Sequence, residues 1–205
     1  PVAAGLAERL AVQFVEVLLA PGYDEDGLET LRRKPATRIL ENRERRLSES
    51  GWRDYKRVPG GFLVQDADRD VDDRDAMAAV TSVQPDEHAW GDLLLAWRVV
   101  KHVTSNAIVI AKDLATVGVG SGQMSRVDAV RIAIEKAREH GHDLEGAALA
   151  SDAFFPFADG PQLALQAGVT TIVQPGGSKR DAEVIEAVDA AGAAMVFTGR
   201  RHFRH

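Results

Sequence analysis

Residues 86–119, DEHAWGDLLLAWRVVKHVTSNAIVIAKDLATVGV, decide the fold class of this chain. From Asp86 to Val100 the apolar residues recur at helical spacing and fall on one face, which predicts a helix. Residues 107–111 are strongly apolar and predict a buried strand, and residues 116–119 predict a second strand. The pattern continues downstream, with expected helices at 126–140 and 181–191 and expected strands at 170–173 and 194–198. This alternation indicates a layered α/β protein.

The residues upstream of this region carry shorter elements. An apolar stripe within residues 6–14 predicts a helix, and residues 15–20 predict a largely buried strand. The other expected elements are a helix at 24–34, a short strand at 37–40, two extended segments at 52–58 and 62–65 around a turn at 59–61, and an exposed acidic connection at 66–75. We place a boundary near residues 76–85 and expect two domains, residues 1–80 and 81–205.

The composition excludes several classes of protein. The chain has 205 residues, 45% of them hydrophobic, with a formal net charge of -6. This acidic balance provides no field that would attract nucleic acid or an anionic membrane surface. The absence of cysteine excludes disulfides, thiol nucleophiles and Cys-ligated metal sites. The longest apolar stretches, such as residues 12–20, are too short to cross a bilayer, and the N-terminus shows no signal peptide. We therefore expect a cytoplasmic protein, with a processed or truncated N-terminus left open.

Two segments next to the predicted strands offer polar chemistry. Residues 118–122, GVGSG, lie between a strand and a helix, where backbone N–H groups could receive an anion, and Arg126 lies just beyond. The segment lacks the spacing of dinucleotide-binding and P-loop fingerprints, so a purely structural turn is equally open. Lys101-His102 and Ser105-Asn106 suit either the orientation or protonation of a polar substrate, or ordinary polar capping.

Two further segments also leave a structural and a functional interpretation open. Residues 151–159, SDAFFPFAD, gather three aromatic residues around a proline between carboxylates. They form either part of the core or a surface that stacks a flat heterocycle. The basic tail, residues 199–205, is either a frayed end or a phosphate clamp. The six histidines have no acidic partner at an established ligand spacing, so we expect no catalytic metal site.

Taken together, these segments resemble the AICAR transformylase domain of the AICAR transformylase/IMP cyclohydrolase family. The resemblance is carried, in the family's order, by APGY at 20–23, GGFLVQ at 60–65, KHVTSN at 101–106, VGVGSGQMSR at 117–126, SDAFFPFAD at 151–159 and RHF at 201–203. It implies layered α/β subdomains of the cytidine-deaminase type. The implied activity is transfer of a formyl group from 10-formyltetrahydrofolate to AICAR in purine biosynthesis. The resemblance also implies a homodimer and a bound monovalent cation such as potassium, held largely by main-chain oxygens.

The resemblance assigns nine residues to two small-molecule sites, one for the nucleotide and one for the folate. The residues at nucleotide-site positions are Glu16, Asn106, Arg126, Arg201 and Phe203. Among these, Asn106 is expected to contact the reacting carboxamide region and to act as the orienting catalytic residue, and the arginines are expected to bind phosphate or polar groups. The residues at folate-side positions are Val127, Phe154, Pro156 and Asp159.

The resemblance further implies that part of the family's machinery lies outside this chain. The family's catalytic Lys-His pair and its Ser-x-Phe-Gly segment lie upstream, in the first of two similar subdomains, and the cyclohydrolase lies further upstream. We therefore expect a C-terminal portion of the enzyme, with His102 structural or orienting and little turnover by the isolated chain. The alternative is a catalytically silent module that binds nucleotide or folate, or completes a dimer. A cytidine-deaminase-like hydrolase is disfavoured, because the chain lacks cysteine and the His-x-Glu motif.

Overall fold

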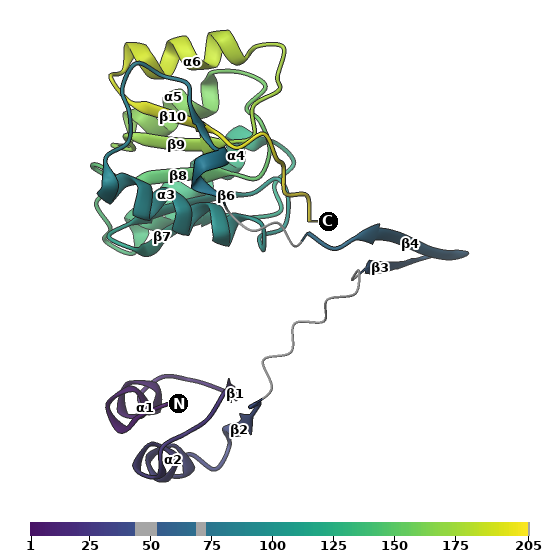
Figure 1. Ribbon diagram of the computed structural model, residues 1–205, viewed down its shortest axis with the longest axis vertical. Helices are drawn as coiled ribbons and strands as arrows, with labels where there is room; N and C mark the ends of the chain where they lie inside the picture. Colours follow the sequence, from purple (N-terminus) through teal and green to yellow (C-terminus); the bar gives the residue numbers. More distant parts are fainter. Residues whose placement is uncertain (44–52, 69–72, 205) are drawn as a thin grey trace. The chain divides into compact units, whose positions relative to one another are not determined.

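A computed structural model describes residues 1–43, 53–68 and 73–204 of the chain (Figure 1). Its contacts divide the chain into two compact units, Pro1–Ala67 and Asp68–His205. In the described ranges, no helix is long and apolar enough to span a bilayer.

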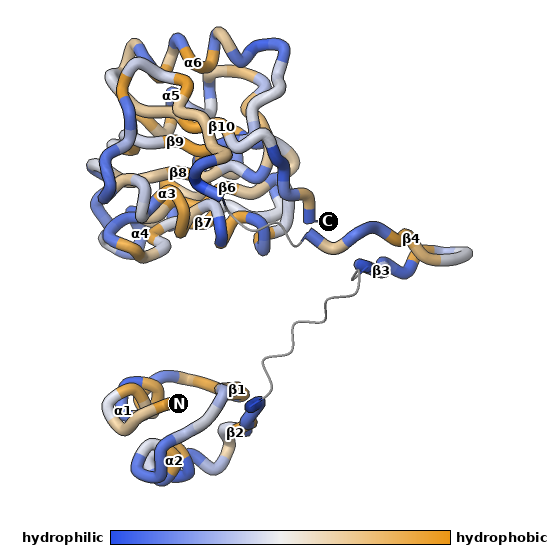
Figure 2. The backbone as a smooth tube through the Cα atoms, in the orientation of Figure 1, coloured by the Kyte–Doolittle hydropathy of each residue, from blue (hydrophilic) through white to orange (hydrophobic). Residues whose placement is uncertain are grey.

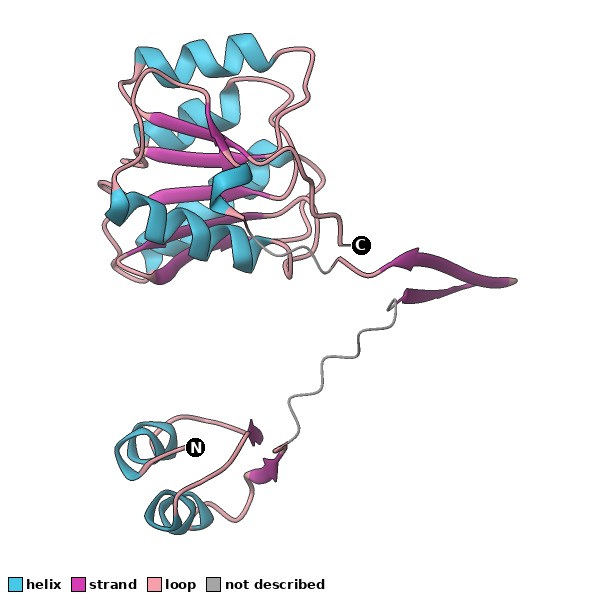
Figure 3. Cartoon of the chain, viewed as in Figure 1, coloured by secondary structure: helices cyan, strands magenta, loops and turns pink. Residues whose placement is uncertain are grey.

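The larger unit is built on one mixed sheet of six strands, in the order β5-β10-β9-β8-β6-β7 (Figure 3). Strands β8, β9 and β10 run parallel to one another. Strand β6 runs antiparallel to β8, β7 antiparallel to β6, and β5 antiparallel to β10. The strand bounds are Ala78–Ala79 for β5, Ile108–Lys112 for β6, Ala115–Gly120 for β7, Ala148–Ser151 for β8, Thr171–Gln174 for β9 and Ala194–Phe197 for β10; a 3-10 turn, η1, spans Arg74–Ala76.

Helices cover both faces of this sheet and make a three-layer α/β unit. Helix α3 covers one face, and α4, α5 and α6 cover the other. Successive residues of a strand point to opposite faces, so Ile108 and Ile110 pack with α4 to α6 while Val109 and Ala111 pack with α3. Figure 2 shows hydrophobic residues concentrated along the central strands. The helix bounds are Glu87–Val100 for α3, Arg126–Glu139 for α4, Asp159–Gln166 for α5 and Asp181–Ala190 for α6.

Two glycines allow α4 to lie directly on β7. A Cβ atom at Gly118 would lie 2.2 Å from the carbonyl oxygen of Ala133, and one at Gly120 would lie 1.9 Å from that of Ala129. Any side chain at either position would force the helix away from the strand. Packing against α4 therefore accounts for both glycines, whereas Gly122, with a φ of 66°, lies in the turn that follows.

The smaller unit contains two short helices, a parallel pair of strands and the hairpin described below. Its helices and parallel strands are α1 (Ala4–Ala11), β1 (Val17–Ala20), α2 (Glu25–Arg32) and β2 (Arg38–Glu41). Its apolar cluster is small and centres on Val2, Ala7, Ala20 and Leu31. The expectation of a largely buried strand at 15–20 is wrong, because Val17 and Leu19 are exposed. In the described part of the chain β1 pairs with β2 alone, so the other edge of this strand makes no strand pairing there.

The segment around Pro59-Gly60 forms the expected hairpin. Strands β3 (Arg53–Val58) and β4 (Gly61–Asp66) pair antiparallel, and Gly60 has the positive φ of 89° that this turn requires. The apolar side chains of Tyr55, Phe62 and Leu63 are exposed on this hairpin.

Candidate functional site

A groove of about 480 Å³ opens where four segments of the larger unit meet. These segments are the loop before β6, the connection from β7 to α4 with the start of α4, the loop after β8 and the C-terminal tail. The volume lies within the range of small-molecule sites. The lining residues are Asn106, Met124, Ser125, Arg126, Val127, Ala153, Phe154, Phe155, Pro156, Phe157, Asp159, Arg201 and Phe203.

Eight of the nine predicted site residues line this one groove. They include four of the five nucleotide-site positions and all four folate-side positions. The ninth, Glu16, is exposed in the smaller unit, just before β1, and its carbonyl accepts a hydrogen bond of 2.8 Å from the Arg38 N–H. Five further lining residues were not assigned to a site from the sequence, although all stand within the segments that carry the resemblance: Met124, Ser125, Ala153, Phe155 and Phe157.

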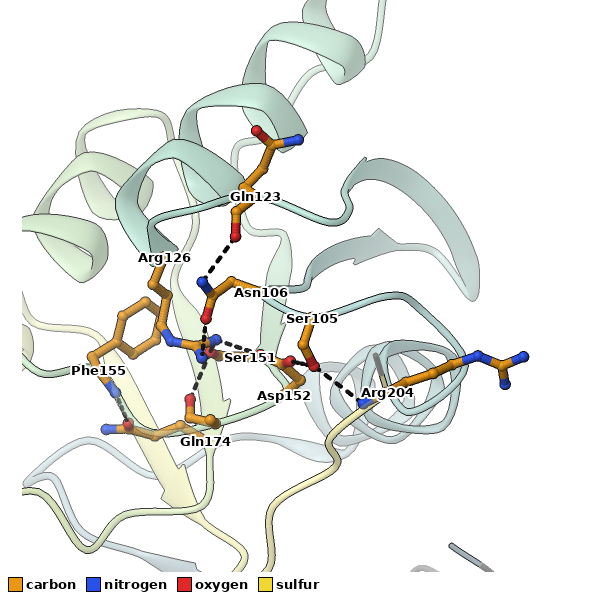
Figure 4. Close-up of polar contacts among 10 residues, drawn as sticks. Ser105, Asn106, Gln123, Arg126, Ser151, Asp152, Phe155, Gln174 and Arg204 are labelled. Carbon is orange, nitrogen blue, oxygen red and sulfur yellow. Dashed lines mark hydrogen bonds and ion pairs between the residues drawn. The ribbon is translucent and has the colours of Figure 1, made fainter. Parts of the chain in front are cut away.

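Arg126 lines the groove and lies at the centre of a network of polar contacts (Figure 4). Its side chain is 9% exposed and pairs with Asp152, whose side chain is fully buried. Nη1 of Arg126 also donates to the Ser151 hydroxyl at 2.7 Å, and Nη2 donates to Oδ1 of Asn106 at 3.0 Å. The guanidinium thus neutralises a buried carboxylate and fixes the amide of Asn106.

Asn106 is held from both ends of its side-chain amide. Oδ1 accepts from Arg126, and Nδ2 donates to the Gln123 carbonyl at 2.9 Å. The peptide bond that joins Ser105 and Asn106 is cis. An asparagine amide carries two N–H donors and two acceptor lone pairs, and the contacts in the described residues use one of each. One donor and one acceptor of Asn106 therefore remain for a molecule in the groove.

The C-terminal tail is tied to the same residues. The Ser105 N–H donates to the Arg204 carbonyl at 2.8 Å, and the Arg204 N–H donates to the Ser105 hydroxyl at 3.2 Å. The His202 N–H donates to the Asp152 carbonyl at 2.8 Å, and the Ser105 hydroxyl donates to the Asp152 carboxylate. The interpretation of the tail as a frayed end is wrong for residues 202–204, because these bonds hold it against the groove.

Arg201 is the groove cation that has no carboxylate partner among the described residues. Its guanidinium carbon lies 4.9 Å from the ring centroid of Phe203, in a cation–π arrangement, and the side chain is exposed. Arg126, by contrast, is neutralised by Asp152. Arg201 is therefore the better placed of the two arginines to bind an anion from solution.

The aromatic cluster divides between the core and the groove. Phe155 is buried, and its N–H donates to Oε1 of the buried Gln174 at 2.7 Å. Phe154 and Phe157 are 36% and 49% exposed and line the groove. The guanidinium carbon of Arg180 lies 4.8 Å from the ring centroid of Phe157. Phe155, although buried, also contributes to the groove lining, so the core and the groove interpretations both apply to this cluster.

The start of α4 closes the groove beside Arg126. Ser125 is its N-cap and accepts a hydrogen bond from the Asp128 N–H, while the Ser125 hydroxyl donates back to the Asp128 carboxylate. This hydroxyl, followed by Arg131, lowers the pKa of Asp128 below its ordinary value.

Neither Lys101 nor His102 lines the groove, and His102 is exposed in the turn after α3. Within residues 1–43, 53–68 and 73–204, no three His, Asp or Glu side chains form a cluster that could hold a metal ion.

The relatives of this chain are much longer proteins, of which it matches only a part. It is 51% identical over 205 residues to the bifunctional purine biosynthesis protein PurH of Chloroflexus aurantiacus, covering 100% of this chain and 40% of that protein. It is 50% identical over 199 residues to the PurH of Chlorobium luteolum, covering 97% of this chain and 38% of that protein. The chain thus spans about 40% of the length of these relatives.

Solved structures give a more distant likeness. A diaminohydroxyphosphoribosylaminopyrimidine deaminase/5-amino-6-(5-phosphoribosylamino)uracil reductase from Thermotoga maritima matches 54% of this chain and 35% of its own, with a TM-score of 0.36 and 23% identity. RibD of Acinetobacter baumannii matches 54% of this chain and 34% of its own, with a TM-score of 0.37 and 19% identity. Scores this low support no argument about function.

The family model described as AICARFT/IMPCHase bienzyme matches residues 1–136, which is more than half of the chain. The relatives of about 50% identity carry the same resemblance through the rest of the sequence, up to all 205 residues. The chain therefore belongs to the AICARFT/IMPCHase bienzyme family.

Proposed function

We propose that this chain is part of a formyltransferase and that its groove binds AICAR beside 10-formyltetrahydrofolate. The observation that carries the proposal is the convergence of eight predicted ligand-site residues, from four separate segments, on one groove of suitable volume. We assign the activity to the full-length protein, because this chain spans about 40% of its relatives. The larger unit, with its mixed sheet between two helix layers, would be the second cytidine-deaminase-like subdomain.

The reaction forms one bond and breaks another at the formyl carbon. The 5-amino nitrogen of AICAR attacks this carbon, the bond to N10 of the folate breaks, and the proton lost by the amine ends on N10. The free N–H and lone pair of Asn106 match the acceptor and donor of the neighbouring carboxamide of AICAR. Since Arg126 and Gln123 fix the Asn106 amide, it would hold the carboxamide, and with it the amine, in one orientation.

The two ends of the substrate pair call for different chemistry. Arg201, without a carboxylate partner in the described ranges, would bind the AICAR phosphate by charge-assisted hydrogen bonds. Phe154 and Phe157 would stack the flat ring system of the folate, and the Asp159 carboxylate would accept its N–H groups. A lining of mostly apolar and aromatic side chains with a few polar groups at fixed places is typical of small-molecule sites.

The test replaces Arg201 by alanine in the full-length protein. We expect AICAR binding, measured by calorimetry, to weaken by about 1–3 kcal/mol, the range for a charge-assisted contact. AICA riboside, which lacks the phosphate, should bind the wild type and the variant equally. The matched control is Arg138→Ala, an exposed arginine in the last turn of α4. Equal AICAR affinity in the wild type and Arg201→Ala would reject the assignment.

A silent binding module would behave differently from part of an enzyme. The 205-residue chain, co-expressed with the part of a PurH relative that it does not cover, should recover formyl transfer if the proposal holds. A folded complex of the two parts without formyl transfer would instead favour the silent module.

A further inference from the structure

The residue between Arg201 and Phe203 turns away from the groove. Arg201 and Phe203 both line the groove, whereas His202 is buried. Its ring centroid lies 4.4 Å from that of Trp97 in α3, on the face of the sheet that α3 covers. Alternate residues of the tail therefore face the groove and the interior.

Among the residues that the structure describes, the His202 ring has one polar partner, Asp68. Nδ1 contacts Oδ2 of Asp68, and since a carboxylate only accepts, Nδ1 carries the proton and donates. Nε2 is buried without a hydrogen-bond partner among the described residues. A buried polar ring with a single partner depends on that partner for its orientation.

The backbone of His202 links this pair to the floor of the groove. Its N–H donates to the Asp152 carbonyl at 2.8 Å, and the Asp152 carboxylate pairs with Arg126. Arg126 in turn donates to Asn106 at 3.0 Å. His202 thus ties the tail, which carries Arg201, to the same group of residues that orients Asn106.

We propose that His202, held by Asp68, is a positioning residue that fixes Arg201 and Phe203 for nucleotide binding. The proposal rests on the proposed function of the groove, because it assigns the nucleotide to the side of Arg201. His202 does not touch the substrate; it acts through the residues on either side of it. Loss of the pair should therefore affect the nucleotide and spare the folate.

The experiment measures formyl-transfer kinetics and AICAR binding in the full-length protein. His202→Leu, which keeps the bulk but removes the donor, should raise the KM and the Kd for AICAR by about tenfold, the loss expected for one charge-assisted hydrogen bond. The KM for the folate should stay within about twofold. His202→Asn, whose side-chain N–H can take the place of Nδ1–H, should recover most of the affinity. The matched control is His140→Leu, an exposed histidine at the end of α4.

Asp68→Ala tests the same pair from a partly exposed residue, and it carries the test if His202→Leu does not fold. It should reproduce the loss in AICAR affinity, and the double variant should lose no more than either single variant. Unchanged AICAR affinity in Asp68→Ala would overturn the inference. Equal losses for AICAR and folate, without recovery in His202→Asn, would also overturn it and indicate a general structural role. A wild type that binds no AICAR would instead refute the proposed function itself.

Discussion

Replacement of Arg126 by methionine tests the polar centre of the groove. Methionine keeps much of the length of the side chain but removes the charge, which leaves Asp152 fully buried without its cation. Removing one partner of a buried ion pair costs about 3–5 kcal/mol. At a urea dependence of about 2 kcal/mol per molar, the midpoint of unfolding should fall by roughly 1.5–2.5 M.

The assay is urea unfolding of the 205-residue chain, followed by circular dichroism and by the fluorescence of Trp90 and Trp97, which are buried in α3. The control is Arg131→Met, which breaks an exposed pair with Asp128 and should change the stability little, because solvent screens such pairs. The double variant Arg126→Met/Asp152→Asn should be more stable than the sum of the two single changes predicts. A loss in Arg126→Met no larger than that of the control would refute the role of this pair.

Two further predictions concern the elements that carry the groove. Gly120→Ala should destabilise the larger unit by about 1–3 kcal/mol in thermal unfolding, because its Cβ would lie 1.9 Å from the Ala129 carbonyl oxygen. The control is Gly5→Ala, whose Cβ would have nothing within 4 Å and which should not be destabilising in the same measurement. Asp128→Asn should lower stability near neutral pH, because the pKa of Asp128 is lowered in the folded state by Ser125 and then Arg131. The contribution of Asp128 to stability is present above about pH 4, the ordinary range of aspartate, and is lost as the pH falls through the lowered pKa. The stabilities of the wild type and the variant should therefore converge in acid. A difference in stability that stays constant with pH would contradict the assignment.

Most elements of the fold could be predicted from periodicity. The helix at 86–100 and the apolar strand at 107–111 appear in the structure as α3 and β6 with nearly the same bounds. The central strand β8 was missed, because it is only four residues long, Ala148–Ser151, and its alanines have a low propensity for strands. Helix α5 was missed as well, since Gly160 and Pro161 stand in its first turn, where proline is tolerated because the N–H has no helical partner there.

Sequence patterns could not decide what the glycines and the aromatic residues do. For Gly118 and Gly120 the sequence leaves an anion-binding loop and a structural turn equally open, because their role depends on how closely α4 approaches β7, which only the packing reveals. Phe155 and Phe157 stand in the same short stretch of sequence, yet Phe155 is buried and Phe157 is half exposed. The link between His202 and Asp68 joins residues far apart in the chain, and no local pattern could have indicated it.

The most direct test of the account is amide hydrogen exchange of the full-length protein with and without AICAR and a folate analogue. We predict slower exchange in residues 104–106, 122–127, 153–159 and 201–204. The nucleotide alone should protect the first and last of these segments, the folate analogue alone the third, and either ligand the second, which holds Arg126 and Val127. Protection that appears elsewhere and leaves these four segments unchanged would contradict the assignment of this groove as the site of formyl transfer.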